Sequence, residues 1–197
     1  MFTGIIVATG VISSRQERDG DVHMGFEAGQ LDLSRVSTGD SISVQGVCLT
    51  VTRQEGSRFF ADVSRETLAK TTLGLRSVGA RVNLEPSLRA GDPLGGHLVS
   101  GHVDAVGRLI GLRQDARSWR LRFELPAELA RFVAPKGSVC VDGVSLTVNE
   151  VEGREFGVNI IPHTHDATTL GGLRDGEGVN VEIDVIARYL ARLMSTP

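Results

Sequence analysis

Short runs rich in Val, Ile and Thr alternate between apolar and polar positions along the chain, and turn-forming glycines interrupt them at short intervals. Alternation with a period of two is typical of β-strands that bury one face. The clearest runs cover residues 41–45, 47–53 and 59–63, and again 138–142, 144–150 and 156–160. A closed barrel suits many short antiparallel strands best, because closure leaves no exposed strand edge. The pattern therefore predicts small all-β barrels.

The chain repeats itself at a constant offset of 97 residues without a gap. The run Gly-Val-Cys-Leu-Thr-Val at 46–51 returns as Gly-Val-Ser-Leu-Thr-Val at 143–148, and Thr-Thr-Leu-Gly at 71–74 returns at 168–171. Matched glycines and apolar residues indicate turns and core positions that the two copies share. Matched positions that differ in chemistry, such as Cys48 and Ser145, are more informative, because packing gives no reason for a polar face to diverge.

Residues 86–96 are rich in Gly and Pro and are interpreted as a linker between the two copies. The predicted domains are residues 1–96 and 97–184, followed by a C-terminal segment at 185–197. Within each copy, residues 67–73 and 164–170 are expected to form short helical or turn segments across a barrel end.

The C-terminal segment has no counterpart in the first copy. One helical face would carry its large apolar side chains, which are Ile186, Tyr189, Leu190 and Leu193. A helix of about ten residues is marginal alone in water. It is therefore expected either to dock on its own barrel or, as the favoured alternative, to associate with other chains.

Composition and charge exclude several function classes. The formal net charge is −3, with 41% hydrophobic and 23% charged residues, which is ordinary for a soluble globular protein. The basic residues are scattered, so neither nucleic acid nor a membrane is an expected partner. No basic signal region precedes the first apolar residues, and no apolar run approaches the roughly 20 residues of a membrane span. A cytoplasmic location is therefore expected, with Cys48 and Cys140 as free thiols.

The strand that begins at residue 47 presents one apolar and one polar face. Alternation separates Val47, Leu49 and Val51 from Cys48, Thr50 and Thr52, and in the second copy Val144, Leu146 and Val148 from Ser145, Thr147 and Asn149. Side chains fill the interior of a small barrel, so the aliphatic set is expected inside. The outward row of thiol, hydroxyl and amide groups is either a solvated surface or a binding face.

No metal centre is expected. His97 and His102 are five residues apart, which on a strand directs them to opposite faces, and His163 and His165 lack a second ligand pair with zinc spacing. The sequence also has no glycine-rich phosphate loop and no nucleophile elbow, which argues against phosphoryl transfer and serine hydrolysis.

Several motifs together resemble the riboflavin synthase family. They are Met-Phe-Thr-Gly-Ile at the N-terminus, the paired Gly-Val-x-Leu-Thr-Val runs, Gly-Gly-His-Leu-Val-Ser-Gly-His-Val at 95–103 and Ile-Pro-x-Thr at 161–164. The resemblance extends from Met1 to about Asp184. It implies two tandem duplicated six-stranded Greek-key β-barrels followed by a short C-terminal α-helix. It also implies a homotrimer joined by these helices, in which the N-terminal barrel of one subunit faces the C-terminal barrel of a neighbour.

The family converts two molecules of 6,7-dimethyl-8-ribityllumazine into riboflavin and 5-amino-6-(ribitylamino)uracil by transfer of a four-carbon unit, the last step of riboflavin biosynthesis. The resemblance thus implies a transferase that binds lumazine and riboflavin and needs no metal or redox cofactor. One lumazine must lose a proton from its acidic 7-methyl group, and the other must be activated by a nucleophile. An association with a lumazine synthase assembly stays open.

Four residues match the family's catalytic positions. Cys48 would be the nucleophile, or the group that orients a water, and an ordinary thiol with a pKa of about 8.5 needs activation for this role. Ser145 and Thr147 would bind the second lumazine and help to move its methyl proton. His102 would take part in proton transfer, a role to which imidazole is suited. Cys140, on an ordinary strand, is expected to be structural.

Substrate recognition is expected to come largely from strand backbone beside the catalytic positions, with short polar side chains, and Lys136 from the other barrel, on the ribityl hydroxyls. Besides the catalytic four, the resemblance implies as binding residues Phe2, Thr3, Gly4, Ile5, Ile6, Ser41, Leu49, Thr50, Asp62, Val63, Ser64, Arg65, Glu66, Thr67, His97, Gly101, Val103, Lys136, Leu146, Asn159, Ile160, Ile161, Pro162, His163, Thr164 and Asp184. Helix capping is the structural alternative for Thr67 and Thr164.

Some features leave alternatives open. The pair at 64–65 and the run His-Thr-His at 163–165 depart from the family's usual residues, which bears on ribityl binding. A non-catalytic lumazine or flavin carrier of the same fold is one competing interpretation. The barrel domain of a flavoenzyme is another, and it would be followed by a nucleotide-binding module that this sequence does not contain. The joint presence of the four catalytic candidates favours the enzyme.

Overall fold

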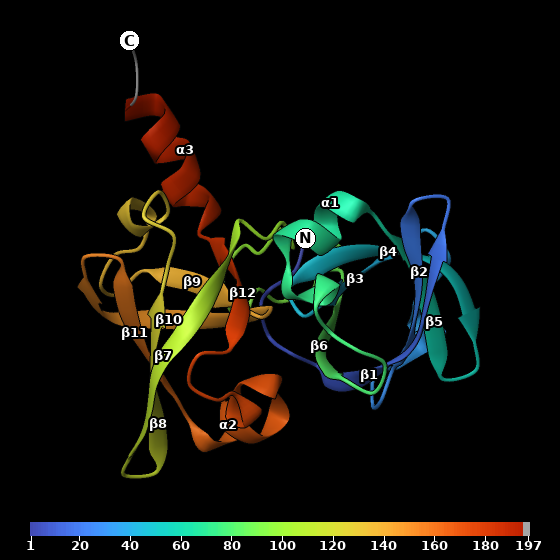
Figure 1. Ribbon diagram of the computed structural model, residues 1–197, viewed down its shortest axis with the longest axis horizontal. Coiled ribbons are helices and arrows are strands. Elements are labelled where there is room, and N and C mark those ends of the chain that lie inside the picture. Colours follow the sequence, from blue (N-terminus) through green and yellow to red (C-terminus); the bar gives the residue numbers. More distant parts are fainter. Residues whose placement is uncertain (195–197) are drawn as a thin grey trace.

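The computed structural model describes residues 1–194, which form two closed antiparallel barrels lying side by side (Figure 1). The first barrel has the strand order β1-β2-β5-β4-β3-β6 and the second β10-β11-β8-β7-β12-β9, which is the same circular order. In each, three hairpin-linked strands lie beside a strand reached by a long connection, which is a Greek key. The predicted fold class is confirmed. The strands are β1 (Ala8–Arg18), β2 (Asp21–Glu27), β3 (Ser41–Val44), β4 (Val47–Glu55), β5 (Arg58–Val63), β6 (Arg81–Pro86), β7 (Ala105–Asp115), β8 (Ser118–Glu124), β9 (Ser138–Val141), β10 (Val144–Glu152), β11 (Glu155–Ile160) and β12 (Gly178–Ile183).

The hairpin turns after β3 and β9 end these strands one residue earlier than the sequence pattern predicts. Gln45 and Gly46 have φ angles of 53° and 82°, and the matched Asp142 and Gly143 have 50° and 84°. Two consecutive residues with positive φ form the two-residue turn whose twist suits a β-hairpin. The polar residue before each glycine therefore belongs to the turn and not to the strand.

Short helices join the strands, and those within residues 65–74 and 162–172 fall where the sequence predicted helical or turn segments. They are η1 (Leu33–Arg35), α1 (Arg65–Lys70), η2 (Thr72–Gly74), η3 (Ala130–Phe132), α2 (Pro162–Ala167) and η4 (Thr169–Gly172). Ser64 caps α1, because its Oγ accepts a hydrogen bond from Thr67 N at 3.1 Å. In α2, Pro162 occupies the first turn and no side chain caps the helix. Neither Thr67 nor Thr164 is a capping residue.

Each barrel closes around its own core. Val47, Leu49 and Val51 are at most 5% exposed inside the first barrel, whereas Cys48 is half-buried and Thr50 is exposed on the outer face. The second barrel repeats this division. The prediction from alternation is therefore confirmed, and it leaves the polar row on the outside of each barrel.

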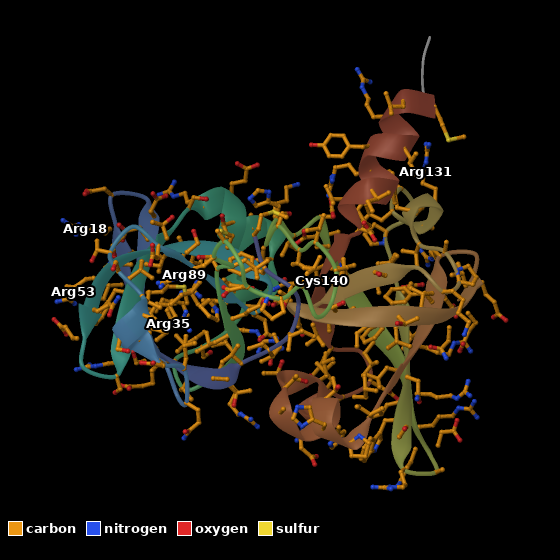
Figure 2. The ribbon with its side chains drawn as sticks, turned by 180° about the vertical axis from the view of Figure 1, so that it is seen from behind. Arg18, Arg35, Arg53, Arg89, Arg131 and Cys140 are labelled. Carbon is orange, nitrogen blue, oxygen red and sulfur yellow. The ribbon has the colours of Figure 1, made fainter. Side chains whose placement is uncertain are left out.

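Two extended segments pass between the barrels. We call residues 1–7 the N-terminal strap and residues 98–104, which follow 97 residues later, the linker strap. Phe2 N donates to Val99 O at 2.7 Å and Val99 N donates to Phe2 O at 3.1 Å. Phe2, Val99 and Cys140 form a small buried cluster, and Figure 2 shows Cys140 between the barrels. The strand geometry assumed for the two histidines is not adopted, because the linker strap makes only this isolated bridge and then crosses to the first barrel.

Backbone and amide groups join the barrels at the two hairpin turns. A Cβ atom on Gly46 would lie 2.6 Å from the backbone nitrogen of Gly143. The Asn83 side chain donates to Asp142 O, and the matched Asn180 side chain donates to Gln45 O, each at 2.8 Å. The seam between the barrels is therefore tight and polar.

One matched pair in this seam differs in charge. Gln45 is neutral, whereas Asp142 carries a carboxyl that is fully buried. Asp142 Oδ1 accepts from Asn180 N at 2.8 Å, but Oδ2 has no hydrogen-bond partner among residues 1–194 and lies 4.0 Å from the Arg76 guanidinium. Burial raises the pKa of Asp142 to about 6, which Arg76 opposes and Glu177 reinforces.

Asp142→Asn is expected to flatten the pH dependence of the free energy of unfolding. A carboxyl whose pKa rises from 3.8 to about 6 on folding binds its proton more tightly in the folded state. Wild-type stability should therefore fall as pH rises through this window and stay lower above it, by on the order of 3 kcal/mol. Urea unfolding at about pH 4 and about pH 7 measures this. The exposed Asp175→Asn is the control, and equal slopes in Asp142→Asn and wild type would contradict the prediction.

The C-terminal helix α3 (Val185–Met194) projects away from both barrels (Figure 1). Ile186, Tyr189, Leu190 and Leu193 are 60%, 66%, 54% and 74% exposed. The predicted helix and its apolar face are confirmed, while residues 195–197 of the predicted segment lie outside the described residues. Within residues 1–194, no helix has the length and apolarity to cross a membrane.

Candidate functional site

A hollow of about 450 Å³ opens on the outer face of the first barrel. Its walls come from β4, from α1 with the residue after it, and from the linker strap. The lining residues are Val47, Cys48, Glu66, Thr67, Lys70, Thr71, Gly101, His102 and Val103. The structure thus brings together six residues that the sequence singled out: Cys48, Glu66, Thr67, Gly101, His102 and Val103. We call this the Cys48 hollow.

Cys48 is tied to the linker strap and remains accessible. Its backbone nitrogen donates to Gly101 O at 2.8 Å. A Cβ atom on Gly101 would lie 2.7 Å from Cys48 Cβ, and Gly101 has a φ of 79°, so only glycine permits this approach. Cys140 is instead 1% exposed, and burial raises the pKa of its thiol well above the ordinary value. Both thiols are free, and Cys48 is the one that a ligand can reach.

On the second barrel the matched position is Ser145, and its hydroxyl meets a histidine. Ser145 Oγ lies 2.6 Å from His97 Nδ1. Burial lowers the pKa of His97 below the ordinary 6.5, although the nearby Asp184 carboxylate works in the opposite direction. His97 Nε2 is buried and has no hydrogen-bond partner among the described residues. A neutral imidazole bonded to a hydroxyl can accept a proton through it, so this pair has the composition of a general base.

Each strap forms a wall of a site on the barrel that it does not lead into. The N-terminal strap leads into β1, yet Gly4 O accepts from Ser145 N at 2.8 Å and Ile6 packs against the second core. The linker strap leads into β7, yet Gly101 O bonds Cys48 N and Val103 packs against the first core. The two sites therefore share a backbone frame built from both barrels.

Within this common frame the side chains of the two sites differ. At matched positions the Cys48 hollow has His102, Glu66 and Lys70, whereas the second barrel has Ile5, His163 and Ala167. Only the second site has His97, which has no counterpart in the first copy. The first site thus combines an accessible thiol with ionisable neighbours, and the second combines a hydroxyl with a buried imidazole.

Comparison with known proteins identifies the family. The lumazine binding domain model matches the chain twice, at residues 3–87 and 100–184. Riboflavin synthase of Photobacterium phosphoreum is 44% identical over 98% of this chain and 89% of its own length. Riboflavin synthase of Mycobacterium tuberculosis is 43% identical over 98% of each chain. The chain belongs to the riboflavin synthase family.

Solved structures share the fold of this riboflavin synthase family member. LumP complexed with riboflavin superposes with a TM-score of 0.86 and 26% identity, over 93% of this chain and 99% of that one. LumP complexed with 6,7-dimethyl-8-(1'-D-ribityl) lumazine superposes with a TM-score of 0.83 and 25% identity over the same shares.

Family resemblance assigns proton transfer to His102, and that assignment stays a prediction, while the structure places a second imidazole beside Ser145. His102 lines the Cys48 hollow on the first barrel, whereas the imidazole that meets Ser145 belongs to His97. The family resemblance implied only a binding role for His97. The contact between His97 and Ser145 joins residues 48 positions apart, and no local pattern reveals it.

Several other predicted binding residues have side chains that are buried or that bind elsewhere in the described chain. The Phe2 side chain is fully buried between the barrels, in the cluster against which Cys48 packs. Arg65 Nε donates to Gly20 O at 2.5 Å, and Asp62 binds His23 at 2.7 Å. Ser41 lines a separate hollow of about 400 Å³ beside Val7 and Leu88. The side chains of Leu49, Val63, Leu146 and Ile160 point into the barrels, so only their backbone can meet a ligand.

The remaining predicted residues stay predictions for this riboflavin synthase family member. They are exposed or half-buried: Ile5, Ile6, Thr50, Ser64, Lys136, Thr147, Asn159, Ile161, Pro162, His163, Thr164 and Asp184. Sequence reasoning missed Lys70 and Thr71 in the Cys48 hollow, and Glu85 and Glu182, which hold the straps. The glutamates recur at matched positions, but alternation places them on the strand face opposite to the core residues Leu84 and Val181, so no signal in the sequence predicted their burial.

Proposed function

We propose that this chain catalyses the reaction of its family, in which two molecules of 6,7-dimethyl-8-ribityllumazine give riboflavin and 5-amino-6-(ribitylamino)uracil. The observation that carries the proposal is the 2.6 Å contact between Ser145 Oγ and His97 Nδ1. The residue that matches Ser145 in the first copy is the accessible Cys48. The two sites share a frame, which suits two identical substrates, and differ in chemistry, which suits their different roles.

Proton removal is assigned to the second barrel. With His97 neutral, the Ser145 hydroxyl donates to Nδ1, and its oxygen can accept a proton from the 7-methyl group while its own proton passes to the imidazole. The methyl C–H bond breaks, and its electron pair delocalises into the lumazine ring. Positioning of the methyl group near Ser145 lowers the barrier further. Thr147, on the same face of β10, is proposed to bind the same lumazine.

Activation of the other lumazine is assigned to the first barrel. Cys48 is the accessible thiol of the chain, and addition of its sulfur, or of a water that it orients, to a ring carbon would prepare that lumazine to receive the four-carbon unit. His102 lines the same hollow and can exchange a proton there. The reaction redistributes atoms between two identical molecules, so its overall balance requires no external oxidant.

The proposal includes an arrangement of subunits. The apolar face of α3 is exposed on the described chain, and its burial against copies of itself would support a homotrimer in which the Cys48 hollow of one subunit faces the Ser145 site of a neighbour. We also propose a cytoplasmic location and a division into residues 1–96, 97–184 and 185–197. The end of β6 at Pro86 and the start of β7 at Ala105 support the first boundary. Association with lumazine synthase is left to experiment.

The test is incubation of the purified chain with 6,7-dimethyl-8-ribityllumazine alone, followed by absorbance and chromatography. One riboflavin should form for every two lumazines consumed. Cys48→Ser should slow turnover by about tenfold or more, because a hydroxyl is a weaker nucleophile than a thiol. Cys140→Ser, which changes the buried thiol, is the matched control and should leave turnover near the wild-type rate.

A carrier is the second candidate, since the fold superposes on LumP. In that case the lumazine would bind and be recovered unchanged, and neither cysteine variant would alter the outcome. Such a result would overturn the catalytic proposal and retain only ligand binding.

A further inference from the structure

Both sites share a feature that the proposed chemistry does not explain. A buried carboxylate binds the backbone of each strap. Glu182, on β12 of the second barrel, is 3% exposed. Its Oε1 accepts from Ser100 N at 2.7 Å and from Ser100 Oγ at 2.5 Å. Its Oε2 accepts from Gly101 N at 2.9 Å and from His102 N at 3.1 Å. Four donors of the linker strap thus converge on one side chain.

The matched Glu85, on β6 of the first barrel, does the same for the N-terminal strap. It is 4% exposed. Its Oε1 accepts from Thr3 N at 2.6 Å and from Thr3 Oγ1 at 2.7 Å, and its Oε2 accepts from Gly4 N at 3.0 Å. The two carboxylates therefore make equivalent contacts in the two copies.

A single glycine in each strap joins a carboxylate of one barrel to the site of the other. The Gly101 N–H donates to Glu182 of the second barrel, and Gly101 O accepts a hydrogen bond from Cys48 N of the first barrel. The Gly4 N–H donates to Glu85 of the first barrel, and Gly4 O accepts a hydrogen bond from Ser145 N of the second barrel. A hydrogen bond on each side of a peptide unit fixes its orientation, so the carboxylate determines where the strap meets the opposite β-strand.

The chain keeps these carboxyls buried despite a cost. Burial raises the pKa of both, and the donors of the straps work in the opposite direction. Hydrogen bonds to a charged acceptor are stronger than those to a neutral one. A charged side chain with three or four converging donors therefore holds backbone more firmly than an amide could.

We propose that Glu182 and Glu85 are positioning residues for the site on the opposite barrel, so that Glu182 sets the geometry of the Cys48 hollow and Glu85 that of the Ser145 site. Loss of Glu182 loosens Gly101 and His102 over Cys48 and leaves His97 in place. Loss of Glu85 loosens Gly4 over Ser145 and leaves Cys48 in place. The importance of these two positioning residues for catalysis rests on the proposed function. Their effect on the geometry of the opposite site does not.

Two readouts that need no turnover test this. The first is the rate at which iodoacetamide alkylates Cys48, since Cys140 is buried. The second is the pKa of His97 followed by NMR, with its signals assigned by comparison with His97→Gln. Glu182→Gln should speed alkylation of Cys48 by about threefold or more and leave the His97 titration unchanged. Glu85→Gln should shift the His97 titration and leave the alkylation rate unchanged.

Milder variants keep the test valid if a glutamine variant fails to fold. Ser100→Ala and Thr3→Val each remove one hydroxyl donor from the same carboxylates and occupy matched positions. Each should act on the same site as its glutamate variant, with a smaller effect. The proposal is overturned if a Glu182 or Ser100 variant alters His97 instead of Cys48, if both readouts move together, or if the folded variants move neither. Absence of riboflavin formation would count against the proposed function alone.

Discussion

His97→Gln is expected to lower kcat by about 100-fold or more, because glutamine can bond the Ser145 hydroxyl but cannot take its proton. The KM for 6,7-dimethyl-8-ribityllumazine should change little. In the wild type, kcat/KM should rise with pH through a value below 6.5, since burial lowers the pKa of His97 and only the neutral imidazole accepts a proton. This limb of the pH profile should disappear in the variant. Exchange of the 7-methyl protons with deuterium, followed by NMR, measures the proton step directly.

His102→Gln is the matched control for that experiment. His102 lies in the Cys48 hollow on the other barrel, so this variant should still catalyse exchange of the methyl protons even if turnover declines. The assignment of the base would be reversed if His102→Gln lost the exchange and His97→Gln kept it. Ser145→Ala should behave like His97→Gln, because either change breaks the same pair.

Gly46→Ala is expected to destabilise the protein by about 3 kcal/mol or more. The new methyl group would lie 2.6 Å from Gly143 N and 3.2 Å from Gly143 Cα. These are backbone atoms at the seam and cannot move without shifting one barrel against the other. The positive φ of Gly46 adds about 1 kcal/mol of strain. Urea unfolding followed by circular dichroism measures the loss of stability.

Gly56→Ala separates the two causes. Gly56 lies in the turn between β4 and β5 with a φ of 58°, and a Cβ atom there would meet nothing within 4 Å. This variant carries the conformational strain without the collision, so it should cost only about 1 kcal/mol. Equal losses of stability in the two variants would show that contact between the barrels contributes little.

The barrels themselves were predictable because their signals are local. Alternation at 47–51 determined which side chains lie inside, although the turn at Gln45 and Gly46 ends β3 one residue earlier than the pattern predicted. The constant offset then carried each element to the second copy. The helical face at Ile186 and Leu190 is likewise a periodic signal within a few residues of sequence.

The candidate site was only partly predictable because its key contacts join distant residues. Cys48 and Ser145 stand out as divergent positions in matched strands, and the sequence shows them directly. The pairing of His97 with Ser145 depends on the path of the chain between the barrels. The roles of Glu85 and Glu182 depend on strap backbone that has no regular secondary structure. The pairing and both glutamate roles depend on how the straps pass between the barrels, which sequence periodicity does not encode.

The exchange of straps also bears on the ancestry of the chain. Gly4 of the first copy bonds the second barrel, and the matched Gly101 of the second copy bonds the first barrel. The side chains of Asn83 and Asn180 bond across the seam in the same reciprocal way. Such paired contacts interchange on rotation by half a turn. An isologous interface between two identical subunits is built in this way. A single barrel with its strap therefore contains the groups needed to pair with a copy of itself. Fusion of two such copies into one gene would have allowed one site to evolve separately from the other without losing the symmetry of the ancestral dimer.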